Sequence, residues 1–122
     1  MVEKSGTRQV VIRPEGDIAI CTNHFVTPPM QEGMAPIAHE NVTENSENRY
    51  ANLRKLTSNL SRPLTVDQMK DILRNHADRG AICQHGQDNI YSLYSYLMLP
   101  GRKEMWFTDG HPCVHEFQAR TL

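Results

Sequence analysis

The sequence lacks a long apolar run and a block of like charge. A transmembrane helix needs about 20 consecutive apolar residues, and the longest apolar stretch, around 97–99, is far shorter. The 13 lysines and arginines and the 14 aspartates and glutamates are dispersed along the 122 residues. We therefore expect no membrane span and no nucleic-acid partner. The first residues do not have the pattern of a signal peptide. The sequence does not fix a compartment, and we take a cytoplasmic location as the default.

Cysteine is also scarce. The three cysteines, Cys21, Cys83 and Cys113, are an odd number that does not suit a disulfide framework. A phosphate-binding glycine loop, a Gly-x-Ser-x-Gly turn and a His-Glu-x-x-His motif are all absent. The sequence predicts no cofactor, and buried thiols are the first interpretation of the cysteines.

What the sequence does contain predicts a single α+β domain, or part of one. Pro, Gly and Asp at 14–17 separate two β-branched runs, which predicts a β-hairpin over 9–22. Residues 26–45 carry three prolines and no sustained period. They are predicted to form a long ordered loop, and such loops in compact domains are often functional.

Two amphipathic helices are predicted next. Ser46 is a candidate N-cap for a helix over 46–60, in which apolar residues recur at three- and four-residue spacing. Thr65 and Gln68 have the spacing of a capping box at the start of a second helix, over 65–79.

The period changes after Gly80, which is a suitable stop for the second helix. Residues 81–119 contain strand-like segments separated by turn residues, and this pattern predicts a C-terminal antiparallel meander. The element order predicts an antiparallel sheet with one face covered by a helix pair.

Two short segments could carry chemistry. Asn23, at the end of a predicted strand, could donate its amide N–H to a developing oxyanion, and His24 could move a proton or shape a pocket wall. The alternative is structural: Asn23 would form a hydrogen bond to the loop that it enters, and the His24 ring would face solvent.

Arg49, in the first turn of a predicted helix, opposes the helix dipole and so indicates an anionic partner. Otherwise it is a solvated side chain that reaches Glu44 or Glu47.

Cysteine and histidine recur together near the C-terminus. Cys83 and His85, like Cys113 and His115, are two residues apart and would share a strand face. The four side chains, with His111 nearby, would suit a tetrahedral Cys2His2 zinc site. Their spacing is not that of a zinc finger, so buried thiols beside surface histidines are preferred and no metal is predicted. A small zinc-binding module stays as the third alternative.

Six motifs, in this order, resemble the C-terminal half of the penicillin acyltransferases. These are relatives of choloylglycine hydrolases and acid ceramidases within the N-terminal-nucleophile superfamily. The motifs are Ile-Cys-Thr-Asn-His-Phe at 20–25, Ser-Glu-Asn-Arg-Tyr at 46–50, Leu-Thr and Ile-Leu-Arg-Asn-His within 64–76, Ile-Cys-Gln-His at 82–85, Ser-Leu-Tyr-Ser at 92–95 and Gly-His-Pro-Cys at 110–113.

The resemblance implies an αββα sandwich in which an N-terminal cysteine, freed by self-cleavage, attacks an amide or thioester carbonyl. The α-amine of that cysteine serves as its base. The resemblance further implies that Asn23 helps to form the oxyanion hole. Substrate contacts are assigned to Arg49, His24 and Phe25.

In the family the nucleophile precedes all of these motifs, and none of the three cysteines matches it. We therefore expect a C-terminal fragment or subunit of a cysteine amidohydrolase or acyltransferase. Its partners are a nucleophile-bearing N-terminal half and an acyl-amide or acyl-thioester small molecule. The alternative is a non-catalytic remnant, or a self-associating domain whose homo-oligomer covers the exposed strand edges.

Overall fold

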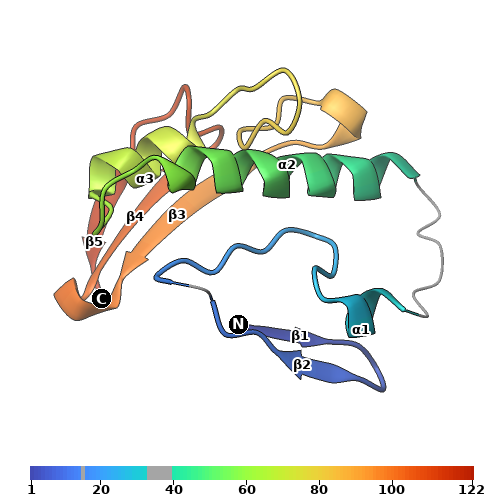
Figure 1. The fold of residues 1–122 in the computed structure, drawn as a ribbon. Helices are drawn as coiled ribbons and strands as arrows, with labels where there is room; N and C mark the ends of the chain where they lie inside the picture. Colours follow the sequence, from blue (N-terminus) through green and yellow to red (C-terminus); the bar gives the residue numbers. More distant parts are fainter. Residues whose placement is uncertain (15, 33–39) are drawn as a thin grey trace.

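The computed structural model describes residues 1–14, 16–32 and 40–122. Antiparallel strands and helices are mixed, which confirms the α+β class. The helices are α1 (Pro28–Gln31), α2 (Glu40–Ser58) and α3 (Val66–Leu73), and the strands are β1 (Val2–Lys4), β2 (Gln9–Val11), β3 (Tyr94–Leu99), β4 (Glu104–Asp109) and β5 (Gln118–Thr121). The long helix α2 has the β1–β2 hairpin on one side and the chain that follows α3 on the other (Figure 1).

The first hairpin differs from the prediction over 9–22. β2 pairs with β1, which precedes it, in an antiparallel ladder that places Val2 opposite Val11. A turn joins them, with the Ser5 N–H donating to the Arg8 carbonyl at 2.9 Å. This partner is closer in sequence than 18–22, which form no strand. The chain after residue 17 is left to contact α2.

The long helix begins earlier than predicted. α2 starts at Glu40 rather than at Ser46, and α1 lies within the segment predicted to be a loop over 26–45. Residues 33–39 of that predicted loop lie outside the described residues. Ser46 is therefore inside the helix, where its side chain is fully buried. No helix in the described ranges is both long and apolar enough to cross a membrane.

The second helix starts as predicted. The Thr65 hydroxyl accepts from the Gln68 N–H at 3.1 Å, and the Gln68 side chain accepts from the Thr65 N–H at 2.9 Å, which confirms the capping box. The helix ends at Leu73 rather than at 79, because the chain turns back on itself. The Asn75 carbonyl accepts from the N–H groups of both residue 82 and residue 83 at 3.0 Å.

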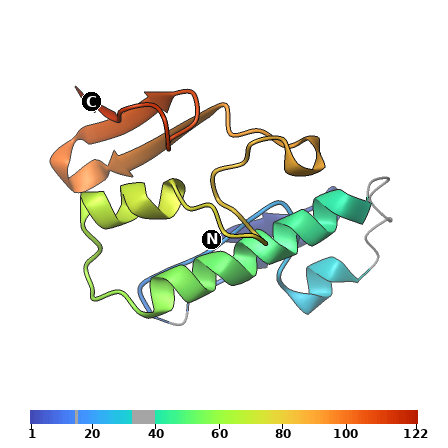
Figure 2. The ribbon, with the colours of Figure 1, turned by 90° about the horizontal axis from the view of Figure 1, so that it is seen from above.

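The C-terminal meander is present, but its sheet is shorter than 81–119. β3, β4 and β5 pair in sequence order as an antiparallel sheet, and residues 81–83 are not a strand. α3 lies over one face of this sheet (Figure 2), where the Lys70 ammonium sits 3.6 Å from the centre of the Trp106 ring. α3 packs against β3, whereas α2 runs beside the loop that follows α3.

The other face of this sheet is apolar and bare. Tyr94, Tyr96 and Met98 on β3 are 65%, 54% and 59% exposed. Tyr96 and Met98 lie opposite Phe107 and Met105 on β4, so the five side chains share one face and line a shallow groove. In a soluble protein, an apolar surface of this kind commonly marks a contact with another part of the molecule or a partner.

Gly80 lies where the chain after α3 crosses α2. Its φ is +75°, a conformation that costs little only for glycine. A Cβ there would lie 2.2 Å from the Asn48 carbonyl oxygen, and the Asn52 amide donates to the Gly80 carbonyl at 2.8 Å. The glycine predicted to stop a helix thus permits a close backbone contact.

Glu3 joins β1 to the chain after Phe25. Its carboxylate is buried and accepts from the N–H groups of Val26 at 2.5 Å and Thr27 at 3.2 Å, and from the Thr27 hydroxyl. Burial by itself raises the pKa of this carboxyl, but these hydrogen bonds outweigh it, and the pKa of Glu3 lies below its usual value.

We predict that Gly80→Ala lowers the free energy of unfolding by about 2–4 kcal/mol, because left-handed strain and steric overlap add. Gly101→Ala is the matched control, since nothing lies within 4 Å of a Cβ there. It should change stability by less than about 0.5 kcal/mol. Urea unfolding of both variants measures the difference, and equal midpoints would contradict the close contact.

We predict that Glu3→Gln lowers the free energy of unfolding at neutral pH by about 1–3 kcal/mol, since charge-assisted hydrogen bonds are lost. The folded pKa lies below the unfolded value of about 4.3. The stabilisation is therefore complete above that pH and is lost as the pH falls through the folded pKa. Urea unfolding at pH 7 and near pH 3 should show the gap to the wild type narrowing. The exposed Glu47, changed to Gln, is the control; an equal gap at both pH values would contradict the assignment.

Candidate functional site

The predicted site residues Asn23 and His24 are attached to α2 by the buried hydroxyl of Ser46. The Asn23 N–H donates to Ser46 Oγ at 2.7 Å, and His24 Nδ1 lies 2.9 Å from the same oxygen. The Thr22 hydroxyl donates to the Ser46 carbonyl at 3.0 Å. Three consecutive residues thus contact one turn of the helix, which fixes their position.

Arg49 lies one turn further along α2 and contacts Asn23 directly. Its Nη2 donates to Asn23 Oδ1 at 2.6 Å, and its Nε donates to Asn45 Oδ1 at 2.8 Å. A guanidinium has donors only, so the amide of Asn23 must present its oxygen to it. The Nδ2 group is left to donate elsewhere, and it makes no hydrogen bond within the described residues.

The position of Arg49 differs from the sequence interpretation in two respects. It lies in the middle of α2, so the argument from the helix dipole does not apply. Glu44, proposed as its partner, instead pairs with Arg79 at 2.6 Å. Burial lowers the pKa of Arg49, although an arginine remains charged at neutral pH. Its side chain is half-buried, so water screens its positive charge less than it would screen a fully exposed one.

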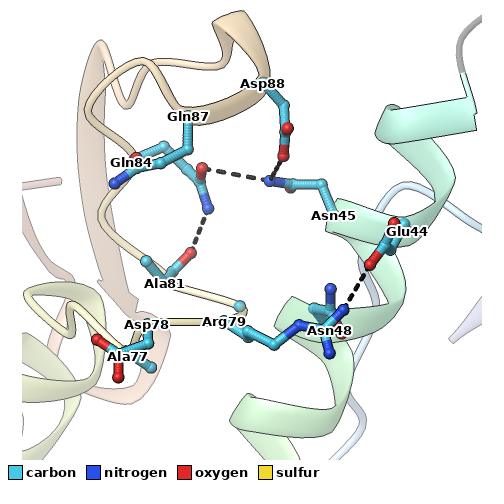
Figure 3. A pocket seen from close by; sticks show the side chains of 11 residues that line it. Glu44, Asn45, Asn48, Ala77, Asp78, Arg79, Ala81, Gln84, Gln87 and Asp88 are labelled. Atoms are coloured by element: carbon cyan, nitrogen blue, oxygen red, sulfur yellow. Dashed lines mark hydrogen bonds and ion pairs between the residues drawn. The ribbon is translucent and has the colours of Figure 1, made fainter.

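A polar cleft of about 270 Å³, lined in part by Asn45, lies between α2 and the loop that follows α3 (Figure 3). The buried Asn45 donates through Nδ2 to Asp88 at 3.1 Å and to Gln84 at 3.4 Å. The Gln84 amide in turn donates to the Ala81 carbonyl. These contacts hold Asn45, and through it Arg49, from the side opposite Asn23.

His24 and Phe25 line a second hollow together with Asn23. The edge of the His24 ring meets Tyr50, with ring centres 5.7 Å apart, and its Nδ1 faces hydroxyl groups, which leaves Nε2 for other contacts. The Phe25 carbonyl accepts from the Gln31 amide at 2.8 Å. The groove against β1 has a volume of about 380 Å³, within the usual size of small-molecule sites.

The arrangement combines an outward amide donor with a fixed positive charge beside a groove. Asn23 is exposed, and Arg49 is half-buried. Such a pair can bind an anionic group or stabilise negative charge on a carbonyl oxygen. Cys21 also lines the groove, but an internal cysteine has no free α-amine to act as its base.

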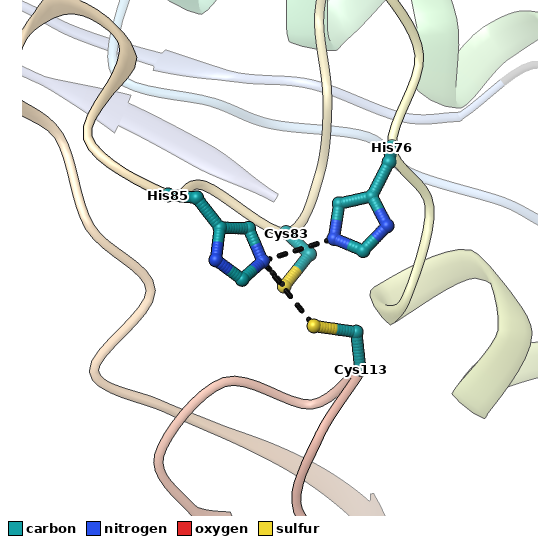
Figure 4. Close-up of side chains that lie close together, drawn as sticks. All are labelled: His76, Cys83, His85 and Cys113. Atoms are coloured by element: carbon teal, nitrogen blue, oxygen red, sulfur yellow. Dashed lines mark hydrogen bonds between the residues drawn. The ribbon is translucent and has the colours of Figure 1, made fainter.

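A second group of side chains gathers beyond α3 (Figure 4). The predicted residues Cys83, His85 and Cys113 are brought together, but the fourth member is His76 rather than His115. His76 falls within the helix predicted over 65–79, but α3 ends at Leu73, so His76 can turn towards His85. Burial raises the pKa of Cys83 to about 11, with a contribution from the neighbouring Cys113 thiol. Cys83 on its own is therefore protonated at neutral pH.

Comparison with known proteins tests the family resemblance that the six motifs indicate. The sequence model of the family described as acyl-coenzyme A:6-aminopenicillanic acid acyl-transferase matches residues 1–113. Searches of curated proteins and of solved structures give no match. The family match confirms the resemblance and supports an acyltransferase- or hydrolase-like function. The motifs, the placement of Asn23 beside Arg49 and the match over most of the sequence lead to one conclusion: the chain belongs to the acyl-coenzyme A:6-aminopenicillanic acid acyl-transferase family.

Proposed function

We propose that this chain supplies the oxyanion donor and the substrate-facing cation of a cysteine N-terminal-nucleophile enzyme. The reaction is acyl transfer or hydrolysis at an amide or thioester bond of a small molecule. The nucleophile comes from a segment outside these 122 residues, because Cys83 and Cys113 belong to another cluster and Cys21, being internal, has no free α-amine to act as its base.

The observation that carries the proposal is the 2.6 Å hydrogen bond from Arg49 to Asn23 Oδ1. An asparagine can present either its acceptor or its donors, and only the donors stabilise an oxyanion. Because Arg49 engages the oxygen, the NH2 group is directed away from the helix. The same guanidinium adds positive charge beside the atom on which negative charge develops.

In this mechanism each residue has a limited task. The thiolate from the partner segment attacks the substrate carbonyl, and the carbonyl oxygen becomes negative. Asn23 donates to that oxygen through Nδ2 until the carbonyl reforms. At that point the amine or thiol of the substrate leaves with the proton held by the α-amine of the nucleophile, and the acyl group stays on the sulfur as a thioester that water or an acceptor amine then cleaves. Arg49 positions the amide, while His24 and Phe25 form the wall of the groove that receives the acyl group or its leaving partner.

The bare apolar face of the β3–β5 sheet supports the need for a further layer. Five apolar side chains share this face, and those on β3 are more than half exposed. In the proposed αββα sandwich, a second sheet packs on it, and two packed sheets bury their inner faces about 10 Å apart. The occupant that we propose is the nucleophile-bearing segment. Self-association through the same face is the alternative.

We predict that Asn23→Ala lowers kcat of the reconstituted enzyme on the order of 10²–10³-fold, as the loss of one oxyanion donor does elsewhere. KM should change little, because the interaction forms mainly in the transition state. Asn59→Ala, at an exposed asparagine just after α2, is the matched control and should retain activity. The measurement is amide and thioester turnover with the nucleophile-bearing segment co-expressed.

The same assay tests how Arg49 acts. If it positions Asn23, then Arg49→Met should reduce kcat strongly in the wild type and much less in the Asn23→Ala background. Such non-additivity is typical of residues that act as one unit. Full additivity would show that Arg49 acts independently of Asn23. An unchanged rate in Asn23→Ala would remove Asn23 from the mechanism.

We predict that Tyr96→Glu prevents co-purification with the nucleophile-bearing segment, because it buries a charge in an apolar contact. The control is Tyr91→Glu, since Tyr91 is 57% exposed and lies outside the sheet. Sedimentation of the chain alone separates the alternatives. A stable homodimer that Tyr96→Glu dissociates, together with no amidase activity in the presence of the segment, would favour the self-associating domain.

A further inference from the structure

The cluster of His76, Cys83, His85 and Cys113 shares no residue with the Asn23–Arg49 site. Its members come from three places in the fold: the turn after α3, the loop at residues 83–85, and the connection between β4 and β5. Figure 4 shows the two rings and the two sulfurs converging on one point. The four candidate ligand atoms all lie within 4.8 Å of one another.

The contacts at His85 are more than hydrogen bonding can satisfy. Its Nε2 lies 3.0 Å from His76 Nε2, 3.2 Å from the Cys113 sulfur and 3.4 Å from the Cys83 sulfur. A ring nitrogen carries either one proton or one lone pair. It cannot make three such contacts as ordinary hydrogen bonds, whereas one shared cation can accept a lone pair from all four side chains.

The separations are close to those of a tetrahedral metal centre. With zinc–nitrogen and zinc–sulfur bonds of about 2.0 and 2.3 Å, ligand atoms are about 3.3 Å apart for two nitrogens and about 3.5 Å for nitrogen and sulfur. The observed 3.0, 3.2 and 3.4 Å are shorter by a few tenths of an ångström. An ion would therefore require only small shifts of the contacts at His85, and the remaining candidate ligand atoms lie within 4.8 Å of one another.

We propose that His76, Cys83, His85 and Cys113 form a structural Zn²⁺ site. Two thiolates and two imidazoles are a set that zinc prefers. Four protein ligands complete the tetrahedron and leave no open position, so the site holds the fold together rather than activating water. The histidines are exposed and Cys83 is buried, so the ion can enter from solvent and be held against the interior.

The surroundings of the cluster suit a structural role. The His111 ring stacks on His85, with centres 4.1 Å apart, and orients it. The segment that carries Cys113 is also held to α3, because Arg74 Nε donates to the Pro112 carbonyl at 3.0 Å. Small domains with few buried apolar groups commonly gain stability from a metal. Here the ion would join α3 and the following loop to the sheet.

A disulfide between Cys83 and Cys113 is the competing arrangement, since the sulfurs are neighbours. It would use the two sulfurs alone and would give no role to the imidazole nitrogens that face them. The convergence of both histidine Nε2 atoms on the thiols favours the metal.

The test is a Co²⁺ titration of the full chain, purified with reductant and stripped by a chelator. We expect one equivalent to bind, with the visible absorption of tetrahedral Co²⁺ and the near-ultraviolet band of thiolate ligation. One equivalent of Zn²⁺ should abolish both and raise Tm. Failure of the reduced wild-type chain to bind stoichiometric Co²⁺ overturns the proposal, whatever the variants do.

Variants then assign the ligands. Cys113→Ser and His76→Asn should each weaken Co²⁺ binding at least about 100-fold, because even the loss of residues around a ligand shell costs 10–100-fold. Cys21→Ser and His115→Asn are controls of the same residue types outside the cluster, and should bind as the wild type does. Cys113→His should restore binding with a weaker thiolate band.

Two results overturn the assignment. One is equal weakening by Cys113→Ser and by Cys21→Ser. The other is a Cys83–Cys113 disulfide in chain purified without reductant, found together with no Co²⁺ binding after reduction. Neither depends on enzymatic activity, so this proposal can fail while the proposed function stands.

Discussion

The described fold depends on one buried hydroxyl. Ser46 lies inside α2 without any exposed surface, and its oxygen contacts both the Asn23 N–H and His24 Nδ1. A buried hydroxyl without partners is costly, so these contacts stabilise the path that the chain takes at residues 22–24. Arg49 is three residues further on and therefore projects from nearly the same side of the helix. By holding residues 22–24 on α2, Ser46 brings the amide and the guanidinium together.

In the described part of the chain, buried polar contacts join distant segments, a role that an apolar core has in most domains. The buried apolar side chains among the described residues are few: Met30, Ala81, Cys83, Pro112 and Phe117. Buried polar groups instead bridge segments far apart in the sequence, as Glu3 does to Thr27 and Asn45 does to Gln84. Such networks are specific, because each member loses its partner if the register changes. They do not by themselves provide the large stabilisation of apolar burial, which agrees with a fold that needs a covering layer on its bare sheet face.

Local signals in the sequence predicted local structure well. The capping box at Thr65 is formed, and the antiparallel meander, the α+β class and the family were all predictable. The errors concern competition between distant segments. Nothing local distinguishes β1 from residues 18–22 as the partner of β2, and the sequence pattern places the start of the long helix at Ser46 rather than at Glu40. Asn23 and Arg49 could be named from motifs, but the direction of the amide depends on a contact across 26 residues.

The two sites are joined by three consecutive residues. In Cys83-Gln84-His85 the side chains alternate, as they do in an extended chain: Gln84 reaches Asn45 in the polar cleft, while Cys83 and His85 face His76 and Cys113. Contacts that fix the positions of Cys83 and His85 therefore also fix the position of Gln84 between them. Displacement of Gln84 would remove one of the two hydrogen bonds that the Asn45 amide donates, the other being to Asp88, and would weaken the hold of Asn45 on Arg49. Through this loop, the proposed metal site would support the positions of Arg49 and of Asn23, the proposed oxyanion donor.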